Sequence, residues 1–285
     1  MTAKDSFPLK LGLNPSRIDV RNLQFAEMLS PTVPLPPIPE SFDIDQISFK
    51  ENMFGNDMWG DCVMAWRANQ TLRFEYCSQK KQIPITTNEV LNEYWIEQGY
   101  KPSSCFLKNA VSPKPDGGLS MLDSLTAWRK NGWQAAGKHY DIYAFLQLPV
   151  ANDWWGQAPT NPTLAAEMAK ADMLLGQAMY LLNGAGIAVN MTNTTMKQFK
   201  ANKNWDLTDP IDRTIIGGHA IYFTGKNTTG PVAISWGKKV QLTWAWWHVY
   251  SSEAFCIVDN KDNFLPSDPI NIPLLESYMN AIGAQ

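Results

Sequence analysis

The spacing of apolar residues changes near residue 183, and this change limits what the chain can fold into. Before it, the segment from Cys62 to Lys81 contains neither proline nor glycine, and its apolar residues recur at helical spacing. After it, short apolar runs such as Ile187 to Met191 alternate with turn residues, as in strands. Helices followed by strands predict an α+β protein with two halves, one helical and one an antiparallel sheet.

Cap residues, glycines and prolines mark where the individual elements begin and end. The expected helices span residues 62–81, 87–98, 120–131 and 163–182. The expected strands span residues 187–191, 219–224, 232–236 and 253–258.

Residues 1–38 differ from the rest of the chain and are interpreted as an N-terminal extension of a domain that spans residues 39–285. The prolines between Pro31 and Pro39 exclude a helix or a central strand there, and residues 21–29 allow one short helical piece. The extension is expected to lie along the domain or to bind a protein partner. Its removal is expected to leave the domain folded.

Charge and cysteine content narrow the functional classes. The net charge of -3 gives no attraction to nucleic acid or to an anionic membrane. No apolar run reaches the ~18 residues of a membrane span, and the N-terminus lacks the apolar core of a secretory signal, so a cytoplasmic or virion-associated protein is expected. The four cysteines form no CxxC pair. We therefore expect no metal site, no cofactor and a reducing environment.

Cys62 follows Gly60-Asp61 at the start of the first predicted helix. Unpaired N–H groups and the positive end of the helix dipole stabilise a thiolate at such a position. A thiol becomes a good nucleophile once it is deprotonated. A lone cysteine is more often a small buried apolar residue, so the position of Cys62 is informative only together with a base.

His219 follows Gly217-Gly218 within an apolar strand of the second half. Many such histidines are core residues held by hydrogen bonds, because a buried polar side chain is costly unless it is paired. A strand of the second half that faces a helix start of the first half can also bring a base within reach of a thiol. Cys62 and His219 are therefore the candidate nucleophile and base.

Five segments occur in the order in which similar segments occur in the papain-like cysteine peptidases. They are Pro39–Asp43, Asn56–Cys62, Gly117–Met121, Gly217–Ala220 and Ser235–Gly237. The distance along the chain from Cys62 to His219 is close to the roughly 130–150 residues expected for that family. The chain resembles a divergent, bacterial or phage-type member without the family's inhibitory helical propeptide. The resemblance covers about residues 39 to 258 and implies a two-lobed fold with the active site between the lobes.

The resemblance also implies roles for individual residues. Cys62 and His219 correspond to the catalytic pair, and Asn56 corresponds to the glutamine that donates to the oxyanion. Gly117 and Gly118 correspond to the segment that binds an extended peptide or protein substrate through its backbone. Trp236 corresponds to the tryptophan that shields the histidine contact from water, and it is expected to bind substrate together with Gly117 and Gly118.

The chain departs from the family at the residue that orients the histidine. The family has asparagine there, and Ile234 occupies that position. Isoleucine cannot form a hydrogen bond with an imidazole. Ser235 is its neighbour, and side chains alternate along a strand, so Ser235 is expected to point to the opposite face.

Three functions remain open at this point. The first is a cysteine peptidase that uses Cys62 and His219. The second is a weakly active or inactive structural or binding module, such as a phage particle component. The third is an amidase that acts on cell-wall peptides.

Two groups of aromatic residues are candidates for a contact surface. Trp244, Trp246, Trp247 and Tyr250 fit packing under a loop better than exposure. Trp154-Trp155 is the better exposed pair.

Overall fold

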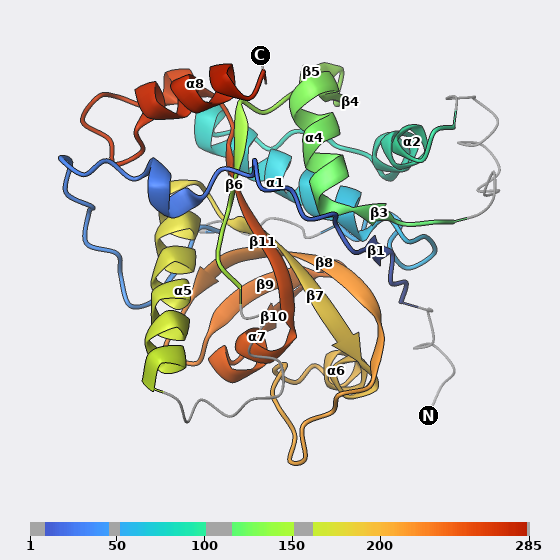
Figure 1. Cartoon of the computed structure of the whole chain (residues 1–285). Coiled ribbons are helices and arrows are strands. Elements are labelled where there is room, and N and C mark those ends of the chain that lie inside the picture. The colour runs from blue at the N-terminus through green and yellow to red at the C-terminus, as the bar shows by residue number, and fades with distance from the viewer. Residues whose placement is uncertain (1–8, 46–51, 101–115, 151–161, 284–285) are drawn as a thin grey trace.

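The computed structural model describes residues 9–45, 52–100, 116–150 and 162–283 and has the predicted α+β architecture (Figure 1). One half is helical and the other is a curled sheet, as the sequence predicted. The helical half contains α1 (Cys62–Gln79), α2 (Thr87–Glu97) and α4 (Met121–Asn131).

The main sheet is antiparallel along its path, in the order β10-β9-β8-β7-β11-β6. Its strands are β6 (Ala144–Gln147), β7 (Ala185–Thr192), β8 (Ile215–Lys226), β9 (Pro231–Ser235), β10 (Lys238–Gln241) and β11 (Ser251–Val258). Two short strands pair with β8, namely β1 (Leu13–Asn14) and β2 (Phe42–Asp43), and β3 (Leu119–Ser120) joins the sheet by pairing with β1. A separate hairpin consists of β4 (Trp133–Ala135) and β5 (Lys138–Tyr140).

Further helices pack around the sheet half. They are η1 (Phe25–Met28), α5 (Pro162–Leu181), α6 (Asn193–Lys200), α7 (Trp244–Tyr250), η3 (Lys261–Asn263) and α8 (Ile272–Ala281). Figure 1 shows α5 along one side of the sheet and α8 above it. No helix within the described ranges has the length and apolar character needed to cross a membrane.

Strand β8 separates two hydrophobic cores because successive side chains of a strand point to opposite faces. Ile221 and Phe223 belong to the core inside the curled sheet. Ala220 and Tyr222 belong to the core between the sheet and the helical half. The strand that carries His219 is therefore fixed from both sides, and α1 packs directly against it.

Residues 23–28 of the extension are part of the core of the sheet half. Phe25 and Met28 are fully buried there, and the carbonyl of Met28 accepts a hydrogen bond from the backbone N–H of Asn271 at 2.8 Å. A deletion that reaches Met28 would therefore open this core.

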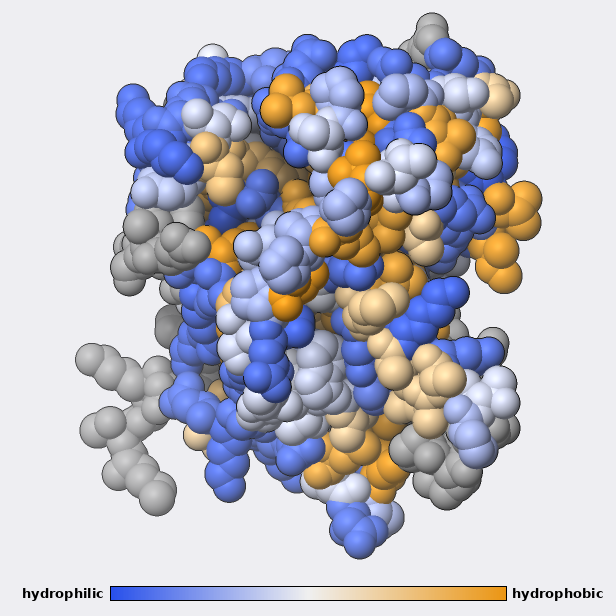
Figure 2. All heavy atoms as spheres, turned by 90° about the vertical axis from the view of Figure 1, so that its left-hand side faces the viewer, coloured by the Kyte–Doolittle hydropathy of each residue, from blue (hydrophilic) through white to orange (hydrophobic). Residues whose placement is uncertain are grey.

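Figure 2 shows the side of the molecule that lies on the left in Figure 1. Hydrophilic residues cover most of this surface, and apolar residues form scattered groups on it.

Candidate active site

Cys62 is the first residue of α1 and only 1% of its surface is exposed. Burial raises the pKa of its thiol to about 12, and backbone hydrogen bonds from Ala220, Gly12 and Val63 act in the opposite direction. Only the N–H of Val63 belongs to the helix start, since Ala220 lies on β8 and Gly12 on the N-terminal extension. In this closed form desolvation outweighs the three hydrogen bonds, and Cys62 is a neutral thiol.

His219 lies on β8 and is as deeply buried as Cys62. Burial lowers the pKa of His219 to about 3, so its imidazole is neutral. The indole ring of Trp236 stacks on the imidazole, with ring centroids 3.9 Å apart and planes inclined by 13°. The predicted shielding residue therefore covers one face of the predicted base.

Four of the predicted site residues line one cavity of about 20 Å³: Cys62, His219, Asn56 and Trp236. The residues that line it come from α1, β8, β9 and the loop before α1. Its volume is close to that of a single water probe, so a peptide cannot enter the site in this form.

Ser235 forms a hydrogen bond with His219, contrary to the orientation expected from the sequence. Its Oγ lies 2.9 Å from Nε2 of the imidazole, and both residues are buried. The reason is the strand register, in which Ile234 pairs with Tyr222. Continuing this register by one residue places Ser235 across from Ile221, on the face that His219 also occupies. Ser235 does point away from Ile234, but the face to which it points is that of the histidine.

Asn56 lies on the loop before α1 and is 2% exposed. Its Nδ2 donates to the backbone oxygen of Trp59 at 3.0 Å, which fixes the loop just before the helix. The amide therefore lines the cavity that contains the thiol while it also holds the loop in place.

Residues 9–14 of the extension lie across the site, which the sequence did not predict. The carbonyl of Lys10 accepts a hydrogen bond from the indole Nε1 of Trp236 at 3.1 Å, and the N–H of Lys10 donates to the carbonyl of Asn56 at 3.2 Å. Strand β1 then pairs with β3 in parallel and with β8 at Gly218. We call residues 9–14 the covering segment. Its backbone joins the two halves over Cys62.

Gly12 is the narrowest point of the covering segment. A Cβ atom at this position would lie 1.9 Å from the carbonyl oxygen of Gly60. On the other side, a Cβ at Gly118 would lie 2.2 Å from the carbonyl oxygen of Gly12. That carbonyl accepts a hydrogen bond from the N–H of Leu119 at 2.9 Å. Both walls are backbone, so no side chain can move aside to admit a larger residue.

The residues predicted to bind substrate thus contact the chain's own N-terminus. Gly117 accepts a hydrogen bond at its carbonyl from Nδ2 of Asn14 at 2.7 Å, Gly118 packs against Gly12, and Trp236 binds Lys10. An extended backbone from the N-terminal extension occupies these positions.

Asp61, directly before Cys62, is a fully buried carboxyl group. Its pKa lies well above the usual value mainly because burial disfavours the carboxylate, while the nearby amide of Asn56 acts in the opposite direction. Nearby, Asp116 accepts a hydrogen bond from the N–H of Gly60 at 3.0 Å and another from the hydroxyl of Tyr94. These contacts hold the turn that leads into α1.

The raised pKa of Asp61 predicts how stability depends on pH. Above pH ~4 the unfolded chain releases this proton while the folded chain keeps it, so the unfolding free energy falls as pH rises toward the folded pKa. The slope for one proton is at most about 1.4 kcal/mol per pH unit. Asp61→Asn should remove this slope and be the more stable form at pH 7, as measured by urea unfolding between pH 5 and 7. Asp57→Asn, on the same loop, should keep the slope, and an unchanged slope in Asp61→Asn would contradict the assignment.

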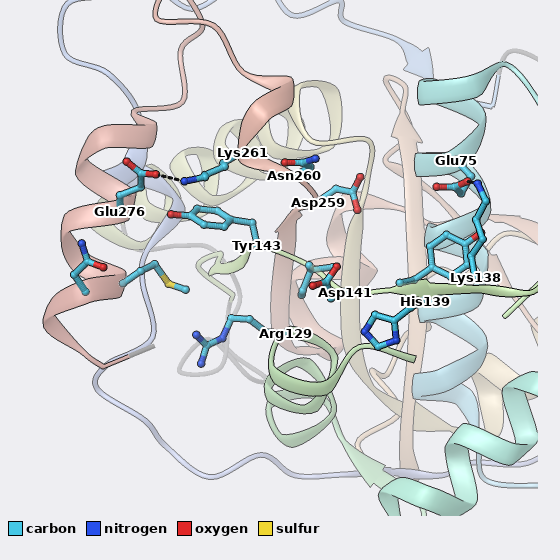
Figure 3. Close-up of a pocket in the computed structure, with 14 residues that line it drawn as sticks. Glu75, Arg129, Lys138, His139, Asp141, Tyr143, Asp259, Asn260, Lys261 and Glu276 are labelled. Atoms are coloured by element: carbon cyan, nitrogen blue, oxygen red, sulfur yellow. Dashed lines mark hydrogen bonds and ion pairs between the residues drawn. The ribbon is translucent and has the colours of Figure 1, made fainter. Parts of the chain in front are cut away.

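A much larger hollow, about 810 Å³, lies elsewhere (Figure 3). It shares no lining residue with the Cys62 cavity. Its charged side chains are of both signs, and Lys261 pairs with Glu276 at 2.6 Å. It contains no cysteine, and the described ranges contain no cluster of three or more residues suited to a metal ion. Size alone therefore does not identify the chemical site.

Three of the four aromatic residues singled out in α7 pack inside the protein, and the fourth, Trp244, is half-buried. Trp246, Trp247 and Tyr250 are buried in the core of the sheet half, which confirms packing over a surface role for them. The pair Trp154-Trp155 lies outside the described residues.

Comparison with known proteins shows the fold. No protein-family model and no curated protein sequence matches the chain. The solved structure of xylellain, a cysteine protease from Xylella fastidiosa, is similar with a TM-score of 0.61 and 11% identity, over 92% of this chain and 100% of that one. The proform of Amb a 11, a cysteine protease and major ragweed pollen allergen, has a TM-score of 0.50 and 11% identity, over 85% and 71%. The chain therefore has a papain-like fold, divided into a helical half and a β-sheet half.

Proposed function

We propose that the chain is a cysteine peptidase that cleaves extended peptide segments with Cys62 as nucleophile and His219 as base. The observation that carries the proposal is the cavity that Cys62, His219 and Asn56 line together. The backbone of the covering segment lies over this cavity. The papain-like fold supports it, since the two similar solved structures are cysteine proteases. In this proposal residues 39–285 are the peptidase domain and residues 1–38 its regulatory extension.

The reaction follows from the two neutral groups. The thiol of Cys62 gives its proton to Nδ1 of His219, and the resulting thiolate attacks a peptide carbonyl carbon. The oxyanion receives hydrogen bonds from the backbone N–H of Cys62 and from the Asn56 amide. The imidazolium then returns the proton to the leaving amine, and water hydrolyses the thioester with His219 again acting as base.

The covering segment must move before this reaction can start. It occupies the backbone partners that a substrate needs, and it keeps the thiol and the imidazole desolvated. Water and substrate that replace it would stabilise the ion pair of thiolate and imidazolium, because both charged forms gain solvation. The described form is the closed state of the enzyme.

Replacing Asn56 is expected to have an intermediate effect on activity. Asn56→Ala removes one oxyanion donor, so kcat should fall by about ten- to a thousandfold with a smaller change in KM. Hydrolysis of an unstructured protein such as casein, followed by amine release, measures this. Asn56→Gln keeps the amide and should retain more activity than Asn56→Ala. Equal rates in the native chain and in Asn56→Ala would remove Asn56 from the mechanism.

The closed site favours a second candidate, a structural module with an unused site. A 20 Å³ cavity and a neutral pair are what such a module would also contain. The two candidates differ in one result. A module shows no hydrolysis of casein or of cell-wall peptides even after the covering segment is displaced, whereas a peptidase or an amidase hydrolyses one of these substrates.

A further inference from the structure

Two contacts from one turn fix the imidazole of His219. Ser235 ends β9, Lys238 begins β10, and these two residues pair with each other, so Trp236 and Gly237 form the turn between them. Ser235 Oγ lies 2.9 Å from Nε2 at the edge of the ring, and Trp236 covers its face.

The backbone of this turn has an unusual conformation, which positions Trp236 and Ser235 against His219. Trp236 has φ 44°, a left-handed conformation that few residues other than glycine adopt, and Gly237 follows with φ 66°. Two positive φ values suit a two-residue turn between antiparallel strands. A tryptophan is costly at the first of these positions, and backbone strain of this kind often marks a functional site. Here the conformation places Trp236 over His219 while Ser235 meets the ring edge.

The other ring nitrogen is left for the thiol. Nδ1 of His219 is buried and has no hydrogen-bond partner among the described residues, and the ring lines the cavity that Cys62 also lines. An imidazole can act as a base through one nitrogen when its other nitrogen carries the proton and donates it to an acceptor. The Ser235 hydroxyl is such an acceptor.

We propose that Ser235 is the positioning residue of His219, performing through a hydroxyl the task for which the resembling family uses an asparagine. Ser235 Oγ accepts the Nε2–H, so Nδ1 is the basic nitrogen and takes the proton of the Cys62 thiol. The Nε2–H···Oγ bond persists when the imidazolium forms and stabilises it. Ile234, which pairs with Tyr222, has no part in orienting the ring. This inference rests on the proposed function.

The test uses the full chain with Gly12→Val, which displaces the covering segment, and compares Ser235→Thr with Ser235→Val. These two side chains have nearly the same shape and differ in the hydroxyl. The readout is the pH dependence of Cys62 alkylation by iodoacetamide, which requires no peptidase activity. A stabilised imidazolium lowers the pKa of the thiol, so the Thr form should keep the parent's fast reaction below pH 7. The Val form should react about ten- to a hundredfold more slowly there and approach the profile of an ordinary thiol.

Ser235→Ala is the smaller variant that fits the same space, and near-UV circular dichroism checks its folding. It should behave like the Val form in both alkylation and kcat, with KM changed less. Profiles for Ser235→Val and Ser235→Ala that coincide with that of the parent would overturn the assignment. A parent chain whose Cys62 never reacts faster than Cys77 would instead contradict the proposed function itself.

Discussion

Gly12→Val is expected to increase the peptidase activity of the chain. The Cβ of the new side chain would lie 1.9 Å from the backbone carbonyl oxygen of Gly60, so the covering segment has to leave its position over Cys62. We expect hydrolysis of casein to rise about ten- to a hundredfold, which corresponds to a shift of roughly 1.4–2.7 kcal/mol in the equilibrium between closed and open forms.

The matched control is Lys10→Val. It introduces the same residue two positions earlier, where the side chain is exposed and only the backbone binds Asn56 and Trp236. Its activity should stay near that of the native chain. Equal activity in Gly12→Val and Lys10→Val would mean that the covering segment does not limit access to Cys62.

Cys62→Ala in the opened chain is expected to abolish hydrolysis, by about 10⁴-fold or more, because the thiol of Cys62 forms the acyl intermediate in the proposed mechanism. His219→Ala should lower the rate nearly as much. The double variant should be no worse than Cys62→Ala alone, since nucleophile and base act as one unit. The readout is amine release from casein at pH 7.

Cys256→Ala is the matched control for the loss of a buried thiol. Cys256 lies on β11, is fully buried, and its Sγ contacts the carbonyl of Leu146 rather than the cavity. It should keep the activity of the opened chain while losing some stability. Residual hydrolysis in Cys62→Ala at the level of Cys256→Ala would exclude Cys62 as the nucleophile.

The sequence was sufficient for the four expected helices and the four expected strands, because local signals determine them. It did not predict β4, β5, β6, β10, α6, α7 or α8. Apolar spacing and caps placed α1, α2, α4 and α5 close to their observed limits, and the glycine at position 132 marked the end of α4. The order of helices before strands, together with the resembling motifs, was sufficient for the α+β class. Helix propensity and capping act over a few residues, so one chain contains this information.

The contacts at the site were less accessible because they depend on pairing between distant strands. Alternation along β9 correctly separated Ile234 from Ser235, but only the register of β8 against β9 decides which of the two shares a face with His219. The position of the covering segment could not be predicted for the same reason, because it depends on contacts between distant parts of the chain. Gly12 meets Gly60 and Gly118 through backbone contacts, and a single glycine in an extended segment has no sequence signal for such a crossing.

The central claim is that Cys62 and His219 form a reactive pair that the covering segment keeps neutral. Its most direct test is the rate of iodoacetamide alkylation at each cysteine, resolved by mass spectrometry at pH 6 in the native chain and in Gly12→Val. The account predicts a slow Cys62 in the native chain, because it is buried with a pKa of about 12, and in Gly12→Val a Cys62 that reacts far faster than the exposed Cys77. A Cys62 in the opened chain that reacts no faster than Cys77 at pH 6 would contradict it.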